Sequence, residues 1–322
     1  MLVQKWQEFV NGVSARINEI IEDTQELGPS FLQTGLFEVV PNPDSLIYRT
    51  KGVTGFNYLQ PFNEDGSIKY DETYPQYGTE YVMKQYAEGV TISQMLMKTR
   101  PQDLEDKLDE VRQLRIAANR TLNKHAWQVL NDAFSATNTV ASLPISRLDD
   151  GVSMISTSHP SKVSGVAVRS NRLASDPLLT DANLDAAEQM ILEMKNGRGL
   201  PISYEGNFIL VVPPALKNDA LRITKSDLQA GTANNDINVF KGIMDVVVSV
   251  YLGNANGGSE TAWYLIAKDA PIKPMKYVSL IDPKIEQDVD FDTKSIKVSV
   301  DASYAFGYSN FEYAVASDGT ND

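Results

Sequence analysis

The stretch TRPQDLEDKLDEVRQLRIAANRTLNKHAWQVLNDAFSA, residues 99–136, predicts one long amphipathic helix. One helix face is filled by apolar side chains that recur every three or four positions: Leu104, Leu108, Val111, Leu114, Ala118, Leu122, Ala126, Val129 and Ala133. Thr99, Pro101 and Gln102 supply a capping hydroxyl, a first-turn proline and a capping-box amide. At about 1.5 Å per residue the helix would extend roughly 50 Å, more than a single compact core requires.

The residues before this helix predict an arm and a hairpin. Residues 2–27 carry apolar side chains at helical spacing, and this stripe must cover either the chain's own core or a neighbouring subunit. Residues 46–56 and 77–92 are rich in β-branched and aromatic residues, and residues 63–66 (NEDG) between them are a turn signal. We expect a long two-stranded hairpin with an irregular tip. Because such a hairpin is marginally stable alone in water, we expect it to lie on another subunit.

The C-terminal half is predicted to be rich in strands. We expect a helix capped by Thr180 or Asp181, a buried strand, a short helix, a two-stranded hairpin and a closing strand, at residues 180–194, 208–212, 215–223, 243–267 and 296–306. In the closing strand Ile296, Val298 and Val300 alternate with polar residues, as a half-buried strand requires. No repeat of the length found in solenoid proteins is present.

Composition sets the class of protein. The 322 residues, 42% of them hydrophobic and 22% charged, are typical of a folded globular chain with more than one folding unit. The lack of cysteine excludes disulfides, thiolate metal sites and cysteine nucleophiles, and it suits a reducing cytoplasm. No run of about 18 apolar residues is present, so no membrane span is expected. The net charge of −13 opposes nucleic-acid binding; it serves solubility alone or forms the acidic inner wall of a DNA container.

The two histidines of the chain offer little for catalysis. His125 lies among polar helix positions that suit a surface or an interface. Ser158 and His159 are adjacent, and adjacent residues rarely bring a nucleophile and its base into line. No nucleophile-elbow pattern surrounds the serine, so we interpret this segment as a structural loop.

Two further patterns resemble ligand sites without meeting their requirements. Asp288, Asp290 and Asp292 alternate as on a solvated strand edge, and they lack the glycine and glutamate of a calcium-binding loop. Residues 253–258 (GNANGG) lack the lysine and the helix of a phosphate-binding loop, so they indicate a turn. We therefore predict no catalytic, cofactor-binding or metal-binding residues, no cofactor and no enzyme activity.

The order of these segments resembles that of the major capsid proteins of tailed double-stranded DNA bacteriophages, which have the Hong Kong 97-type fold. Residues 2–43 resemble the N-terminal arm of this family, residues 46–92 its extended loop and residues 99–136 its spine helix. NFILVVPPALKNDALR (residues 207–222) resembles the entry to the axial domain. FDTKSIKVSVDASYAFGYSNFEYAVA (residues 291–316) resembles the closing strand, so the likeness covers essentially the whole chain.

The resemblance implies an α+β chain with a Hong Kong 97-like capsid fold. Its parts would be an N-terminal arm, an extended β-hairpin loop, a peripheral domain with the spine helix, a mixed α/β axial domain and return strands to the peripheral domain. In the same order these parts would occupy residues 1–45, 46–98, 99–196, 197–280 and 281–322.

The implied function is that of a structural major capsid protein without catalysis. Copies would assemble through pentamers and hexamers into an icosahedral shell, which encloses double-stranded DNA without sequence-specific binding and involves no membrane. About forty residues precede the extended loop, too few for a fused scaffolding segment, which implies either a separate scaffolding protein or a chain numbered after processing. The Met1 start favours the separate scaffolding protein, and a portal and decoration proteins are expected as further partners. The implied location is the virion, after synthesis in the host bacterial cytoplasm. Two alternatives stay open: an encapsulin-type nanocompartment shell around protein cargo, and a serine-dependent hydrolase that uses Ser158 and His159.

Overall fold

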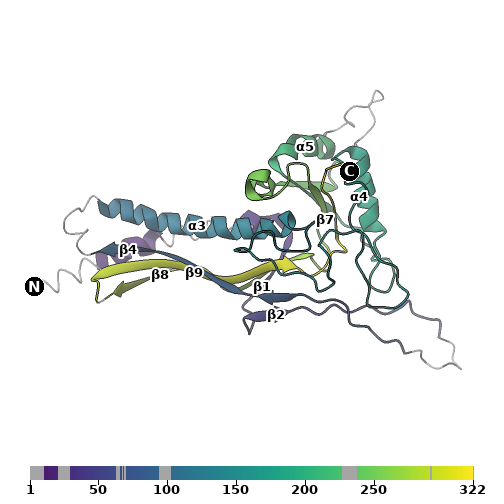
Figure 1. Cartoon of the computed structure of the whole chain (residues 1–322), viewed down its shortest axis with the longest axis horizontal. Helices are drawn as coiled ribbons and strands as arrows, with labels where there is room; N and C mark the ends of the chain where they lie inside the picture. The colour runs from purple at the N-terminus through teal and green to yellow at the C-terminus, as the bar shows by residue number, and fades with distance from the viewer. Residues whose placement is uncertain are drawn as a thin grey trace, which may run out of the picture.

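The computed structural model describes residues 11–20, 30–62, 66, 68, 70–93, 103–226, 238–290 and 292–321. These residues form two four-stranded sheets and one two-stranded ribbon, together with several helices. Figure 1 shows an elongated molecule in which the first sheet and a long helix form an arm, and the second sheet forms a more rounded part at one end. An extended segment projects from the region where the two parts meet (Figure 1).

Helix α3 (Asp103–Asn131) confirms the predicted long helix. Its predicted cap at residues 99–102 lies outside the described residues. The helix ends before Ala136, the predicted end, because the chain turns at Asp132. The buried carboxylate of Asp132 accepts hydrogen bonds from the backbone N–H and the hydroxyl of Thr139, which closes a loop where a further helical turn was expected.

The first sheet lies along α3 and has the strand order β1-β8-β9-β4. Its strands are β1 (Phe37–Pro41), β4 (Lys84–Ser93), β8 (Met275–Asp290) and β9 (Ser295–Tyr308). Strand β1 is parallel to β8, and β9 is antiparallel to both of its neighbours. The long β8–β9 hairpin and α3 run side by side in Figure 1, which accounts for the length of the arm.

Strand β9 confirms the predicted closing strand. Ile296, Val298 and Val300 are buried with α3, whereas Lys297 and Ser299 are exposed on the opposite face. Towards the end of the strand both faces are buried, because residues of the two-stranded ribbon pack against the second face. The alternation predicted along the whole strand therefore holds in its first half.

Residues 11–20 form a helix that packs on the chain's own core. Val13, Ile17 and Ile20 are buried in one cluster with α3 and with the far part of the first sheet. Arg16 adds an exposed ion pair to Glu105 at 2.6 Å. The sequence left open whether this stripe covers its own chain or a neighbour, and in the structure residues 11–20 cover their own chain.

The second sheet has the order β10-β7-β5-β6. Its strands are β5 (Phe208–Val212), β6 (Met244–Val248), β7 (Trp263–Ala267) and β10 (Ala314–Ser317). Helices α4 (Asp181–Leu192) and α5 (Lys217–Lys225) pack on it, and the 3-10 turn η2 (Pro214–Leu216) leads into α5. The Thr180 hydroxyl accepts a hydrogen bond from the backbone N–H of Asn183, so the predicted cap of α4 is confirmed.

One expectation for the second sheet needs correction. The predicted hairpin at residues 243–267 is wrong, because β6 and β7 pair on opposite sides of β5 and not with each other. The buried β5 is central, and 3-10 turns η3 (Val250–Leu252) and η4 (Asn254–Asn256) replace the tight turn. Strand β10 pairs with β7 at the edge of the second sheet.

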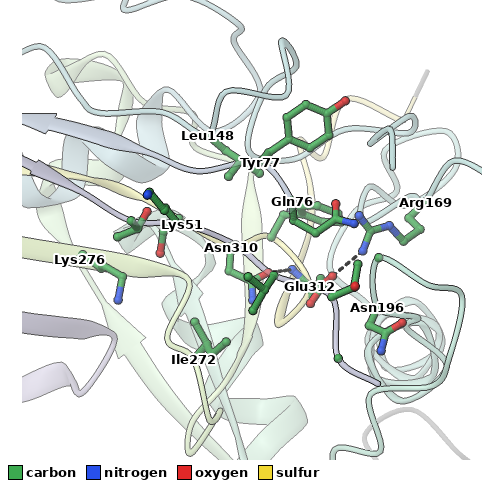
Figure 2. Close-up of a pocket in the computed structure, with 18 residues that line it drawn as sticks. Lys51, Gln76, Tyr77, Leu148, Arg169, Asn196, Ile272, Lys276, Asn310 and Glu312 are labelled. Atoms are coloured by element: carbon green, nitrogen blue, oxygen red, sulfur yellow. Dashed lines mark hydrogen bonds and ion pairs between the residues drawn. The ribbon is translucent and has the colours of Figure 1, made fainter. Parts of the chain in front are cut away.

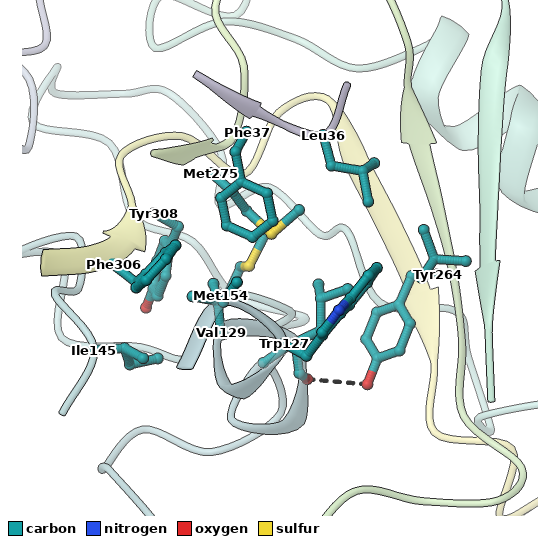
Figure 3. Packing of buried hydrophobic residues seen from close by; sticks show 14 of the residues in the cluster. Leu36, Phe37, Trp127, Val129, Ile145, Met154, Tyr264, Met275, Phe306 and Tyr308 are labelled. Atoms are coloured by element: carbon teal, nitrogen blue, oxygen red, sulfur yellow. Dashed lines mark hydrogen bonds between the residues drawn. The ribbon is translucent and has the colours of Figure 1, made fainter. Parts of the chain in front are cut away.

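One hydrophobic core joins the two sheets around the C-terminal half of α3 (Figure 3). The 3-10 turn η1 (Ser30–Thr34) inserts Phe31, whose ring meets those of Phe37 and Phe306 edge-on with centroids 5.2 Å apart. From the other side, the Tyr264 hydroxyl on β7 donates to the carbonyl of Leu130 at 3.0 Å. The root of the projecting segment packs on the other face of the first sheet, where Tyr81 is buried with Val278 and Ala305.

Candidate assembly surface

The projecting segment, residues 46–82, is named the extended loop. Its two ends form a short antiparallel ribbon of β2 (Ile47–Arg49) and β3 (Glu80–Val82). Farther out, a bridge between Val53 and Pro75 joins the two arms of the loop. The predicted long hairpin is thus confirmed only at its root. Residues 84–93 belong to the first sheet as β4, where they pair with β9 and not with the outgoing arm of the loop.

The arms of the extended loop carry an exposed apolar surface. Leu59 is 96% exposed. The other large apolar side chains exposed on the loop beyond its ribbon are Val53, Phe56, Tyr58, Phe62, Ile68, Tyr70 and Tyr74. Single exposed apolar residues are normal, whereas a concentration of them is characteristic of interaction surfaces, because it is costly in water.

Arg198 holds both arms of the loop just beyond the Val53–Pro75 bridge. Its Nε donates to the Thr54 hydroxyl at 3.3 Å on one arm. On the other arm its guanidinium pairs with the Asp71 carboxylate at 2.5 Å, donates to the Glu72 carbonyl and lies 5.2 Å from the centre of the Tyr74 ring. The hydrogen bond from Arg198 holds the pKa of the Asp71 carboxyl below its usual range.

A cavity of about 290 Å³ separates the root from the segment after β9 (Figure 2). Arg169 and Glu312 form an ion pair on its wall, and burial raises the pKa of the Glu312 carboxyl in spite of that partner. Lys162 closes another side of the root: its ammonium lies 4.5 Å from the centre of the Tyr77 ring and donates to the Gln76 carbonyl at 3.3 Å. Contacts of several kinds therefore fix the loop where it leaves the body.

The geometry of His159 does not match that of a catalytic base for Ser158. His159 is fully buried, with Nδ1 2.8 Å from the Asp150 carboxylate and Nε2 3.1 Å from the Asn171 side-chain oxygen. Its ring stacks on Phe311 at 3.5 Å between centroids. Both ring nitrogens thus have partners other than a serine hydroxyl. The prediction of a structural loop here agrees with this buried network.

The expectation that His125 lies on a surface or an interface is wrong. The side chain is 1% exposed, and its ring lies among those of Tyr86, Tyr304 and Phe306. Nε2 is 3.0 Å from the Pro144 carbonyl, and burial lowers the pKa of His125 to about 4. The cause is position: this end of α3 runs between the two sheets, so polar positions of the helix are buried as well as apolar ones.

The acidic side chain of Asp290 stabilises the turn between β8 and β9. Asp290 accepts hydrogen bonds from the backbone N–H groups of Asp292 and Thr293 and pairs with Lys297 at 2.5 Å. The Lys297 contact holds the pKa of the Asp290 carboxyl well below its usual range. Within the described residues no three acidic or histidine side chains gather as a metal site would require. In the same part of the chain, no helix combines the length and apolarity needed to cross a lipid bilayer.

Solved structures of phage shells share this fold. The mature capsid of bacteriophage PhiM1 is 15% identical, with 88% of this chain and 85% of that chain covered and a TM-score of 0.52. The procapsid of bacteriophage JBD30 is 13% identical, with 96% and 75% covered and a TM-score of 0.51. The capsid of Myoviridae phage XM1 is 11% identical, with 90% and 91% covered and a TM-score of 0.51. No protein of curated function matches the sequence.

The mixed fold of helices and strands is shared with these shells and defines a Hong Kong 97-type subunit. The sequence model of the phage capsid protein family matches residues 76–317, so the chain belongs to that family. Its role is that of a structural major capsid protein of a bacteriophage, a component of the virion. The family favours this function over the encapsulin-type and hydrolase alternatives.

Proposed function

We propose that copies of this chain assemble into a closed icosahedral shell around double-stranded DNA, and that the extended loop is a contact between neighbouring copies. The observation that carries the proposal is the exposed apolar surface of the loop arms, with Leu59 almost wholly in solvent. Burying a phenylalanine or leucine side chain stabilises a contact by about 1.5–3 kcal/mol. Because every copy would repeat the contact, modest energies per loop add up in a closed particle.

Further partners follow from the same function. Pentamers and hexamers would form through the domain of the second sheet. A separate scaffolding protein, a portal and decoration proteins would complete the particle, which is made in the host bacterial cytoplasm. The chain would enclose DNA without reading its sequence, and its net charge of −13 suits a wall that does not grip phosphates. The function requires no catalysis, and the partners of His159 are consistent with that.

The test replaces three apolar side chains of the loop at once: Phe56→Ser, Leu59→Ser and Phe62→Ser. All three are exposed in the single chain, so the melting temperature of the unassembled subunit should change by no more than a few degrees. The yield of closed particles should fall at least tenfold, as measured by particle sizing and negative-stain microscopy of one preparation. Val168→Ser removes an exposed apolar side chain outside the loop and is the matched control. Normal particles from the triple variant would refute the proposed contact.

A further inference from the structure

The turn that carries Arg198 has a well-determined backbone. The Asn196 side-chain oxygen accepts hydrogen bonds from the backbone N–H groups of Arg198 at 2.9 Å and Leu200 at 3.1 Å. Gly199 adopts a left-handed φ of 84°, which glycine allows without strain. A bridge between Lys195 and Pro201 ties the turn to the end of α4. Arg198 therefore stands on a support that belongs to the body of the subunit and not to the loop.

The turn and the loop are also packed closely beside Arg198. A Cβ atom on Gly197 would lie 2.5 Å from the side-chain nitrogen of Gln76, so Gln76 occupies the space that the glycine leaves open. Arg198 then reaches past this contact to Thr54 on the outgoing arm and to Asp71 on the returning arm. One side chain thus connects the body to both arms.

Because Arg198 is buried, its contacts favour one orientation of the loop relative to the body of the subunit. Its side chain is only 5% exposed, and a buried guanidinium requires partners for its planar set of donors. Three of the groups bonded to it come from the loop: the Thr54 hydroxyl, the Asp71 carboxylate and the Glu72 carbonyl. If the loop turned away, the charge would lose these partners together. One orientation of the two arms satisfies all of them, so that orientation is favoured over its neighbours.

We propose that Arg198 is the positioning residue that sets the direction in which the extended loop leaves the subunit. The Asp71 carboxylate is its main partner on the returning arm, and the hydrogen bond to the Thr54 hydroxyl fixes the position of the outgoing arm. The inference rests on the proposed function only for its consequence in assembly: a loop that points in one direction before contact loses less conformational freedom when it binds a neighbour. The direction itself is a property of the single chain.

The experiment measures that direction in the unassembled subunit. Because the chain has no cysteine, Leu59→Cys on the loop and Lys124→Cys on α3 give two specific positions for spin labels. Both residues are exposed. With Arg198 present the distance distribution should be narrow, and Arg198→Ala should at least double its width. Arg198→Lys keeps the charge but not the fork of donors, so its width should lie between these values. Arg222→Ala, which removes an exposed arginine paired with Asp219 on α5, should leave the distribution unchanged.

Two further measurements separate this inference from the proposed function. Asp71→Asn removes the ion pair from the loop side, so it tests the contact even if Arg198→Ala folds poorly. It should broaden the distribution less than Arg198→Ala does. Parental widths in both variants would overturn the positioning role. A broadened loop in Arg198→Ala, together with a parental yield of closed particles, would leave the positioning role standing and refute its consequence for assembly, whereas the contact itself is tested by the triple loop variant.

Discussion

At the scale of single residues, His125 shows how burial fixes a charge state. Its ring lies among three aromatic rings, and Nδ1 has no hydrogen-bond partner among the described residues. A second N–H on the ring would therefore be buried without an acceptor. Burial is the main reason that the pKa of His125 falls to about 4, and the charge of Lys84 acts in the same direction.

The pKa shift of His125 predicts a pH dependence with a definite sign. The unfolded histidine has a pKa of about 6.5, so between about pH 6.5 and 4 the unfolded chain binds more protons than the folded chain. The free energy of unfolding therefore decreases as the pH falls through this window, and His125 alone accounts for a decrease of about 3 kcal/mol. His125→Gln does not titrate. Denaturant unfolding at pH 7 and pH 4 should show the difference in unfolding free energy between wild type and variant shrinking towards acid by about that amount. A constant difference would contradict the assigned burial.

At the scale of elements, the start of α3 depends on an apolar contact with residues 11–20. Val111 is fully buried in that contact, whereas Gln113, half a turn away, is exposed. Val111→Asp would bury a charge without a partner and should cost several kcal/mol, on the order of 2–5. Gln113→Asp is the matched control and should change stability by less than about 0.5 kcal/mol. Thermal or denaturant melts of both variants check the assignment of the face. Equal stabilities would show that the face is wrong.

The elements that could be predicted from sequence are those whose pattern is local. Helix α3, the buried FILVV strand and the cap at Thr180 each carry their signal within a few neighbouring residues. The hairpin at residues 243–267 was not predictable, because the choice of partner for β6 and β7 depends on β5, which is distant in sequence. For the same reason no pattern distinguishes β4 from the returning arm of the loop, although one pairs with β9 and the other with β2.

Neither the exposed apolar surface of the loop nor the contacts of Arg198 could be predicted from the sequence. The marginal stability of a lone hairpin predicts that it lies on another subunit, but it does not single out the exposed side chains of residues 53–62. Arg198 has no local sequence signal either. Its partners lie more than a hundred residues earlier in the chain, and a glycine-flanked arginine is ordinary in a turn.

At the scale of the whole molecule, shape is the measurable property. A compact globule of 322 residues would have a radius of gyration of roughly 20 Å. Figure 1 shows a long arm and a projecting loop, so the unassembled subunit should exceed that value clearly in small-angle X-ray scattering. The triple loop variant provides unassembled protein for the measurement. A value near 20 Å would mean that the arm or the loop folds back on the body in solution.

The helix at residues 11–20 has a consequence for the life of the subunit before it meets a partner. Val13, Ile17 and Ile20 keep the far end of the first sheet dry with side chains from the same polypeptide. A newly made copy can therefore accumulate before assembly without exposing that apolar stripe to other proteins. Proteolytic removal of the residues ahead of residue 30 would expose this apolar stripe and make the unassembled subunit prone to aggregation.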